Sequence, residues 1–213
     1  MGSVTRLREA AGSNDRAERT MGLAAVLSGV LTEAGSRPVL VGGGAVEIYT
    51  RSAYTTRDLD FVAAMTESAS KAMAGLGFDR DGRHWIHEEL GIVVEFPGTT
   101  LAPAEAISID VDGIELRIIA VEDLVVDRLA SWKHWGWDPD GAAAVILLAL
   151  HQDLDQERLR KRAIDEHVAD ALESLRPLAG SDEPISEDEL RRLRASLKGS
   201  GEGVTSERAP TRT

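Results

Sequence analysis

The chain of 213 residues contains no cysteine, so disulfide bonds and thiolate metal sites are excluded. No segment approaches the ~20 apolar residues that a membrane span needs. The longest apolar run, AAAVILLAL at 142–150, predicts a buried helix instead. Arg6 and Arg8 are not followed by an apolar segment, so we expect no secretory signal peptide at the N-terminus. These absences predict a cytoplasmic protein that does not enter a membrane.

Positive charge is also scarce. The chain has 24 Lys and Arg against 36 Asp and Glu, a formal net charge of −12. A protein that binds nucleic acid through its phosphates needs a basic face, so this balance argues against general DNA binding. It is compatible with a small nucleotide delivered with Mg²⁺, and with local basic patches on an acidic body.

The remaining composition is that of a globular protein, with 43% hydrophobic and 28% charged residues. We expect four parts: a flexible N-terminus at 1–14, an α/β core at 15–120, a helical part at 121–178 packed on that core, and a polar, disordered tail at 179–213. The pattern predicts the α+β class, a mixed β-sheet covered by helices.

Periodicity and turn residues place the individual elements. A strong turn dipeptide, Asp112-Gly113, predicts a hairpin between two of the strands. Residues around Gly77 and Phe78 are expected to be irregular. We expect helices at 15–34, 45–51, 66–75, 121–134, 139–150, 155–174 and 186–197, and strands at 38–41, 58–63, 83–88, 91–96, 107–111 and 114–119.

The most informative stretch is 39–61, VLVGGGAVEIYTRSAYTTRDLDF. A short apolar run ends at Gly42, Gly43 and Gly44, a helical segment follows, and the next strand carries Asp58 and Asp60. Side chains alternate across a strand, so the two aspartates share one face. Neighbouring carboxylates repel each other unless a cation or a proton lies between them. Oxygen ligands of this kind suit Mg²⁺.

This stretch resembles the nucleotidyltransferase superfamily that includes DNA polymerase β. The resembling features are the glycine turn at 42–44, the short helix after it, and the T-x-D-h-D-h pattern at 56–61, TRDLDF. Within the superfamily the chain looks most like small stand-alone members, including toxin-type members of abortive-infection systems. The resemblance implies a nucleotidyltransferase-like sheet and transfer of an NMP from an NTP to a hydroxyl acceptor. It implies Mg²⁺ or Mn²⁺ as the metal, with Asp58 and Asp60 as ligands.

The family also has a third carboxylate, from a neighbouring strand. Glu95 is the candidate, because a charged residue inside the apolar strand IVVEF needs a partner. Asp110 and Asp112 are weaker alternatives, since Asp112 is already used by the turn.

Two further sets of residues are expected to hold phosphate. Gly42, Gly43 and Gly44 would present backbone N–H groups at a helix N-terminus, although many relatives have a serine in this turn. A second family-like stretch at 121–133 contains Arg128 and Lys133, which would neutralise triphosphate charge, and Asp138 or Asp140 would match the acidic residue that follows. The alternative is that either residue is an ordinary charged side chain on the solvent-exposed face of a helix.

Other residues have less specific patterns. Three tryptophans lie close together in the chain, at positions 132, 135 and 137. They are candidates for stacking on a base, but tryptophans in such a pattern more often seal the join between two helices. His84 and His87 point to opposite faces of a strand, which argues against a zinc site. The basic residues form an RNA-facing patch or, because acidic residues are interspersed, an ordinary solvated surface: Arg158, Arg160, Lys161, Arg162, Arg191, Arg192 and Arg194.

The acceptor implied by the family is an RNA or tRNA end, a protein side chain or a small alcohol, and a toxin-type member would have a cognate antitoxin. One alternative function is a catalytically silent nucleotidyltransferase fold that acts as a binding module or antitoxin. Another is plain hydrolysis of phosphate esters by the same carboxylates.

Overall fold

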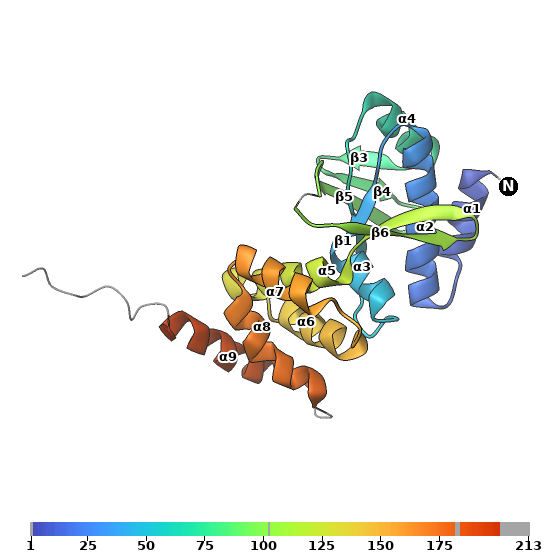
Figure 1. The fold of residues 1–213 in the computed structure, drawn as a ribbon. Helices are drawn as coiled ribbons and strands as arrows, with labels where there is room; N and C mark the ends of the chain where they lie inside the picture. The colour runs from blue at the N-terminus through green and yellow to red at the C-terminus, as the bar shows by residue number, and fades with distance from the viewer. Residues whose placement is uncertain (1, 102, 182–183, 201–213) are drawn as a thin grey trace, which may run out of the picture. The chain divides into compact units, whose positions relative to one another are not determined.

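The computed structural model describes residues 2–101, 103–181 and 184–200, and it divides into two units, Met1–Leu124 and Val125–Thr213 (Figure 1). The first unit contains a mixed β-sheet with helices, and the second is helical, which confirms the α+β class. The first unit contains α1 (Ser3–Ala11), α2 (Arg16–Glu33), β1 (Val39–Val41), α3 (Gly42–Tyr49), β2 (Asp58–Val62), α4 (Glu67–Gly75), β3 (Asp79–Asp81), β4 (His84–His87), β5 (Ile92–Gly98), β6 (Ala106–Val111) and β7 (Ile114–Ile119). After α5 (Val121–Ala130), which crosses the division, come the π-helical turn η1 (Ser131–Trp135), α6 (Asp138–Leu150), α7 (Gln156–Asp165), α8 (Ala169–Leu175), the 3₁₀ turn η2 (Arg176–Gly180) and α9 (Glu187–Ser200).

The sheet has the strand order β3-β4-β5-β2-β1-β7-β6. β2 lies between β1, which is antiparallel to it, and β5, which is parallel to it. Burial alternates along β2: Leu59 and Phe61 are buried, whereas Asp58 and Asp60 are partly exposed. One face of this strand therefore belongs to the core, and the other carries the aspartates.

The predicted first helix is confirmed as α2. Asp15 caps it by accepting a hydrogen bond from the Glu18 backbone N–H at 2.9 Å, and Gly35, with φ of +84°, follows its end. Leu23, Leu27 and Leu31 are buried on one side of it. The helix packs against β7 and contacts α1, α3 and α4, so it organises the core of the first unit.

The expected flexible N-terminus was wrong for residues 3–11, which form α1. The reason is Leu7, which is fully buried and gives this short segment an apolar anchor against α2. The side chains of Arg8 and Glu89 also form two hydrogen bonds, of 2.5 and 2.8 Å. The hydrogen bond from Arg8, together with its charge, lowers the pKa of Glu89.

The helix expected at 45–51 begins earlier, at Gly42, so the three glycines are the first turn of α3 rather than a loop before it. Only Gly42 has a positive φ, of +62°. At the other end of α3, the Tyr49 hydroxyl donates a hydrogen bond to the Ile119 carbonyl of β7 at 2.8 Å. Burial, followed by the charge of Glu122, raises the pKa of this hydroxyl. Both ends of α3 are therefore tied to the sheet.

Three other segments differ from the sequence-based expectation. The stretch after Phe78 is not irregular, because Asp79–Asp81 pairs with β4 as the short strand β3. The helix expected at 155–174 is interrupted at His167, whose φ of +58° ends one helix before α8 begins. Residues 187–200 form α9, which confirms the helix expected at 186–197 and corrects the disorder expected for this part of the tail; residues 201–213 lie outside the described part.

The hairpin around Asp112-Gly113 is confirmed by the antiparallel pairing of β6 with β7. Both turn residues have positive φ, 51° for Asp112 and 77° for Gly113, as a tight two-residue hairpin turn requires. Within the part of the chain that was searched, no helix combines the length and apolar character of a membrane span. The cytoplasmic location stays a prediction.

We expect Leu7→Ala to destabilise the first unit by about 2–5 kcal/mol, because it leaves a cavity between α1 and α2. Urea unfolding followed by circular dichroism measures the change. Val4→Ala is the matched control, since Val4 lies on the same helix but is 42% exposed. Equal effects of the two substitutions would contradict the packing of α1 against the core.

Candidate metal centre

The candidate site is a row of residues in register across four strands. Asp60 of β2 pairs with Val41 of β1 on one side and with Glu95 of β5 on the other. Glu95 in turn pairs with His84 of β4. Residues paired in register project to the same face of a sheet, so Asp60, Glu95 and His84 lie side by side on one surface.

The structure brings together the three carboxylates that the sequence analysis selected. One carboxylate oxygen from each of Asp58, Asp60 and Glu95 lies within 4.8 Å of the other two. Two come from adjacent positions on one face of β2 and the third from the neighbouring parallel strand. Such a set of hard oxygen donors fits the ligand preference of Mg²⁺ or Mn²⁺, so the residues present are compatible with the expected metal.

Glu95 has two basic neighbours that sequence reasoning did not assign to the site. Its Oε1 lies 3.1 Å from Nε of Arg83, and its Oε2 lies 3.1 Å from Nε2 of His84. The Glu95 side chain is only 13% exposed, so these contacts matter for a charge held largely away from water. The register of the hairpin between β4 and β5 could have predicted one of these neighbours, because pairing Ile92 with His87 places His84 opposite Glu95.

The three glycines leave room for side chains of β2 and the segment before it. A Cβ atom on Gly42 would lie 2.1 Å from Oδ2 of Asp60, and one on Gly43 would lie 2.7 Å from Oγ1 of Thr56. A Cβ on Gly44 would lie 3.0 Å from Cδ2 of Leu59. These close approaches explain the glycines by packing and bring the N-terminus of α3 against Asp60. Their predicted contact with phosphate stays a prediction.

Two residues beside Asp58 complete this part of the site. The Thr56 hydroxyl donates a hydrogen bond to Oδ1 of Asp58 at 2.8 Å. Glu47 of α3, which is 1% exposed, accepts a hydrogen bond from the Thr56 backbone N–H at 3.1 Å. Sequence reasoning did not select Glu47, although a lone acid between Val46 and Ile48 already indicated a buried charge that needs a partner.

The alternatives to Glu95 have other contacts. Asp112 forms the turn between β6 and β7, and Oδ1 of Asp110 accepts a hydrogen bond from the Gly113 backbone N–H at 3.2 Å. Neither belongs to the carboxylate group, so Glu95 is the third carboxylate that the geometry supports.

The two cations expected to hold phosphate both have carboxylate partners within the second unit. Arg128 contacts Asp127 and donates a hydrogen bond to Oδ1 of Asp140 at 2.9 Å. Nζ of Lys133 lies 2.6 Å from Oδ1 of Asp170 and donates to the His167 carbonyl at 2.7 Å. These ion pairs give both residues a structural role, and their contact with phosphate stays a prediction.

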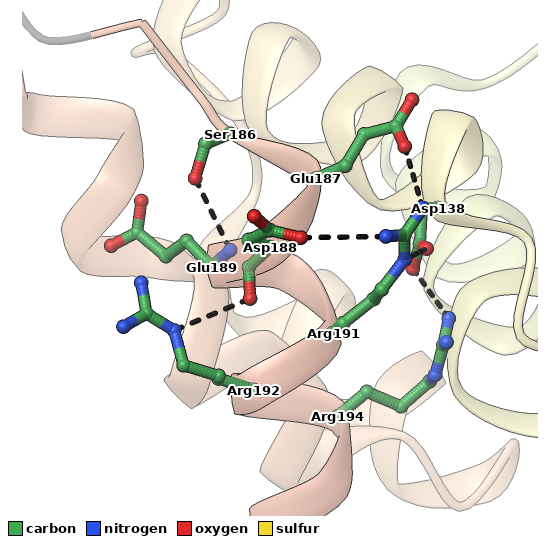
Figure 2. Close-up of polar contacts among 8 residues, drawn as sticks. All are labelled: Asp138, Ser186, Glu187, Asp188, Glu189, Arg191, Arg192 and Arg194. Carbon is green, nitrogen blue, oxygen red and sulfur yellow. Dashed lines mark hydrogen bonds and ion pairs between the residues drawn. The ribbon is translucent and has the colours of Figure 1, made fainter.

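Asp138 has its own role in the second unit, where it connects α6 to α9. Its buried carboxylate accepts hydrogen bonds from Nε of Arg191 at 3.0 Å and from Arg194 at 2.6 Å (Figure 2). Arg191 also pairs with Glu187 and Asp188 on its own helix (Figure 2). These ion pairs favour the alternative of an ordinary charged surface over an RNA-facing patch here.

The three tryptophans have different environments. Trp132 is fully buried, and a Cβ on Gly141 of α6 would lie 2.6 Å from its ring, so it seals a helix junction. Trp135 and Trp137 are 85% and 60% exposed. Base stacking by these two residues stays a prediction.

Comparison of the chain with protein-family models, curated proteins and solved structures finds no match. The resemblance to nucleotidyltransferases therefore rests on the motif at 42–61, on the looser family-like stretch at 121–133, and on the position of Glu95 beside the motif.

We expect Gly42→Ala to disturb the carboxylate group directly, because the new methyl group would overlap with Asp60. Gly35→Ala is the matched control: Gly35 also has a positive φ, of +84°, but nothing lies within 4 Å of its Cβ position. Both substitutions incur the backbone cost of about 1–2 kcal/mol. Gly42→Ala should lower the free energy of unfolding by about 1–3 kcal/mol more than Gly35→Ala does, because its methyl group overpacks the space beside Asp60.

Urea unfolding in EDTA checks this difference. Equal stability of the two variants would contradict the close approach of α3 to β2.

Proposed function

We propose that this protein is a Mg²⁺-dependent nucleotidyltransferase that transfers an NMP from an NTP to a hydroxyl acceptor, with pyrophosphate as the leaving group. The observation that carries the proposal is the convergence of Asp58, Asp60 and Glu95, with one oxygen of each within 4.8 Å of the others. The sequence predicted this set from the family pattern, and the pairing of β2 with β5 supplies a physical reason for its proximity.

The three carboxylates would hold the metal in this proposal. Bound Mg²⁺ would neutralise the negative charge of the nucleotide phosphates and help to orient them. The N-terminus of α3 lies beside Asp60, and the first N–H groups of a helix have no partner within the helix. Gly43 and Gly44 would therefore offer backbone N–H donors to a phosphate close to the metal.

Glu95 has a second role in the proposal, as the base that accepts the proton of the attacking hydroxyl. Its Oε1 contacts Arg83 and its Oε2 contacts His84, and the Arg83 side chain is 70% exposed, so its guanidinium would also be accessible to a phosphate. The acceptor class stays open among an RNA or tRNA end, a protein side chain and a small alcohol. Membership of a toxin–antitoxin pair and a cytoplasmic location are part of the proposal.

One observation favours the second candidate function, a catalytically silent fold that binds a partner. Both oxygens of Glu95 already have side-chain partners, Arg83 and His84, which stabilise the carboxylate without a metal. In that case the protein would bind neither Mg²⁺ nor NTP at these residues.

Metal binding separates the two candidates. We expect Mg²⁺ at 100 times its dissociation constant to stabilise the protein by about 2.7 kcal/mol, measured by thermal unfolding with Mg²⁺ or EDTA. The double substitution Asp58→Asn/Asp60→Asn should abolish this gain. Asp79→Asn/Asp81→Asn is the matched control, because it has the same spacing on a strand with exposed residues. Equal stabilisation of all three proteins would contradict the site.

Nucleotidyl transfer is tested with each α-³²P-labelled NTP, Mg²⁺, and cellular RNA plus protein extract as acceptors. Wild type and the Asp79→Asn/Asp81→Asn control should transfer label, and Asp58→Asn/Asp60→Asn should be slower by about 1000-fold. This estimate assumes several kcal/mol of transition-state stabilisation from the metal, at 1.36 kcal/mol for each tenfold change in rate.

The labelled product identifies the acceptor class. Release of phosphate without any labelled acceptor would instead support hydrolysis, and equal labelling by the Asp58→Asn/Asp60→Asn variant would contradict the proposed catalytic role.

A further inference from the structure

Glu47 is a buried carboxylate to which the proposed reaction gives no role. It lies in α3 and is 1% exposed. A charge so far from water needs an ionic partner and hydrogen bonds to both of its oxygens. Its Oε1 accepts a hydrogen bond from Nε of Arg16 at 3.2 Å, and its Oε2 accepts one from the Thr56 backbone N–H at 3.1 Å. Glu47 therefore connects α2 to the segment that leads into β2.

These residues form a closed ring of hydrogen bonds. The second arm of the Arg16 guanidinium donates from Nη2 to the Thr56 carbonyl at 3.1 Å. Thr56 lies two residues before Asp58, where the pairing of β2 with β5 starts, so its backbone groups lie outside that ladder. Within the ring, the Thr56 N–H has Glu47 as its hydrogen-bond partner and the Thr56 carbonyl has Arg16, so both backbone groups are paired. Thr56 is thereby held on both sides of its Cα.

The side chain of Thr56 extends from this ring to the carboxylate group. Its hydroxyl donates to Oδ1 of Asp58 at 2.8 Å, since an ionised carboxylate has only acceptors to offer. Gly43 leaves the space that this hydroxyl occupies, because a Cβ there would lie 2.7 Å from Oγ1. A hydrogen bond to one oxygen restrains the rotation of the carboxylate and leaves the other oxygen for a cation.

We propose that Glu47 and Arg16 are positioning residues for the metal centre, which act through Thr56 to orient the carboxylate of Asp58. The inference rests on the proposed function, in that it assumes a divalent cation at Asp58, Asp60 and Glu95. Residues that hydrogen-bond to metal ligands typically contribute about 10–100-fold to metal affinity. Arg16 belongs to α2 and Glu47 to α3. The affinity for the metal would therefore depend on how these two helices pack on the sheet.

The test is a titration with Mn²⁺, in which electron paramagnetic resonance reports the free ion. Thr56→Val keeps the shape of the side chain and removes the hydroxyl, so the dissociation constant for Mn²⁺ should rise by about 10-fold. Thr56→Ser keeps the hydroxyl and should bind Mn²⁺ as wild type does. A purely structural role of Thr56 would not distinguish these two variants by their affinity for the metal.

The ring itself is tested with Glu47→Gln and Arg16→Lys. Glutamine has only one side-chain acceptor for two donors, so one link of the ring is lost. Lysine keeps the charge but not the planar fork that bridges Glu47 and Thr56. Each should raise the dissociation constant by about 10-fold. Glu67→Gln is the control, because Glu67 is an exposed glutamate that pairs with Lys71 on α4.

The outcomes separate this inference from the proposed function. Absence of Mn²⁺ binding by wild type would overturn both. Tight binding by wild type and by Thr56→Val, Glu47→Gln and Arg16→Lys alike would overturn the positioning role and leave the metal centre intact. Urea unfolding in EDTA checks that each variant is folded. If Glu47→Gln does not fold, Arg16→Lys decides, since the side chain of Arg16 is 57% exposed and its substitution leaves no cavity in the core.

Discussion

The register of β2 between β1 and β5 is the constraint on which the rest of the candidate site depends. It puts Asp60 beside Glu95 and opposite Val41, the last residue before the glycines of α3. A slip of one residue would turn Leu59 and Phe61 out of the core and bury the aspartates. The hydrophobic face of β2 thus fixes the position of its acidic face. Core packing and the geometry of the carboxylate group are consequences of the same pairing.

The first turn of α3 packs closely against β2 and so also limits where the side chains of the site can lie. Three successive glycines let the helix approach the strand so closely that Asp60, Thr56 and Leu59 occupy the space of their missing side chains. The approach also brings Glu47 within hydrogen-bond distance of the Thr56 backbone. A buried acid, an arginine from α2 and a threonine before β2 then act as one unit. The site is supported by two helices as well as by the sheet that carries it.

Much of this arrangement followed from local sequence patterns. Alternation along TRDLDF was enough to place Asp58 and Asp60 on one face, and the isolated acid in IVVEF was enough to select Glu95. Local patterns failed where a contact with a distant residue decided the outcome. Leu7 orders a segment that looks flexible, because α2 provides its apolar partner. Arg128 and Lys133 pair with acidic residues up to 37 positions away, which no spacing rule reveals.

The sequence by itself determined the α+β class and the order of most elements, because hydrophobic period and turn chemistry act over a few residues. The resemblance to a family, together with strand alternation and the isolated acid in IVVEF, selected Asp58, Asp60 and Glu95 as candidates. Only the tertiary structure decided that Glu95 faces Arg83 and His84, that the glycines form the first turn of α3, and that Glu47 reaches Thr56. These contacts depend on strand register and on how closely helices approach the sheet. Both are properties of the whole packed unit, since each residue's partners are set by the space that distant segments leave for it.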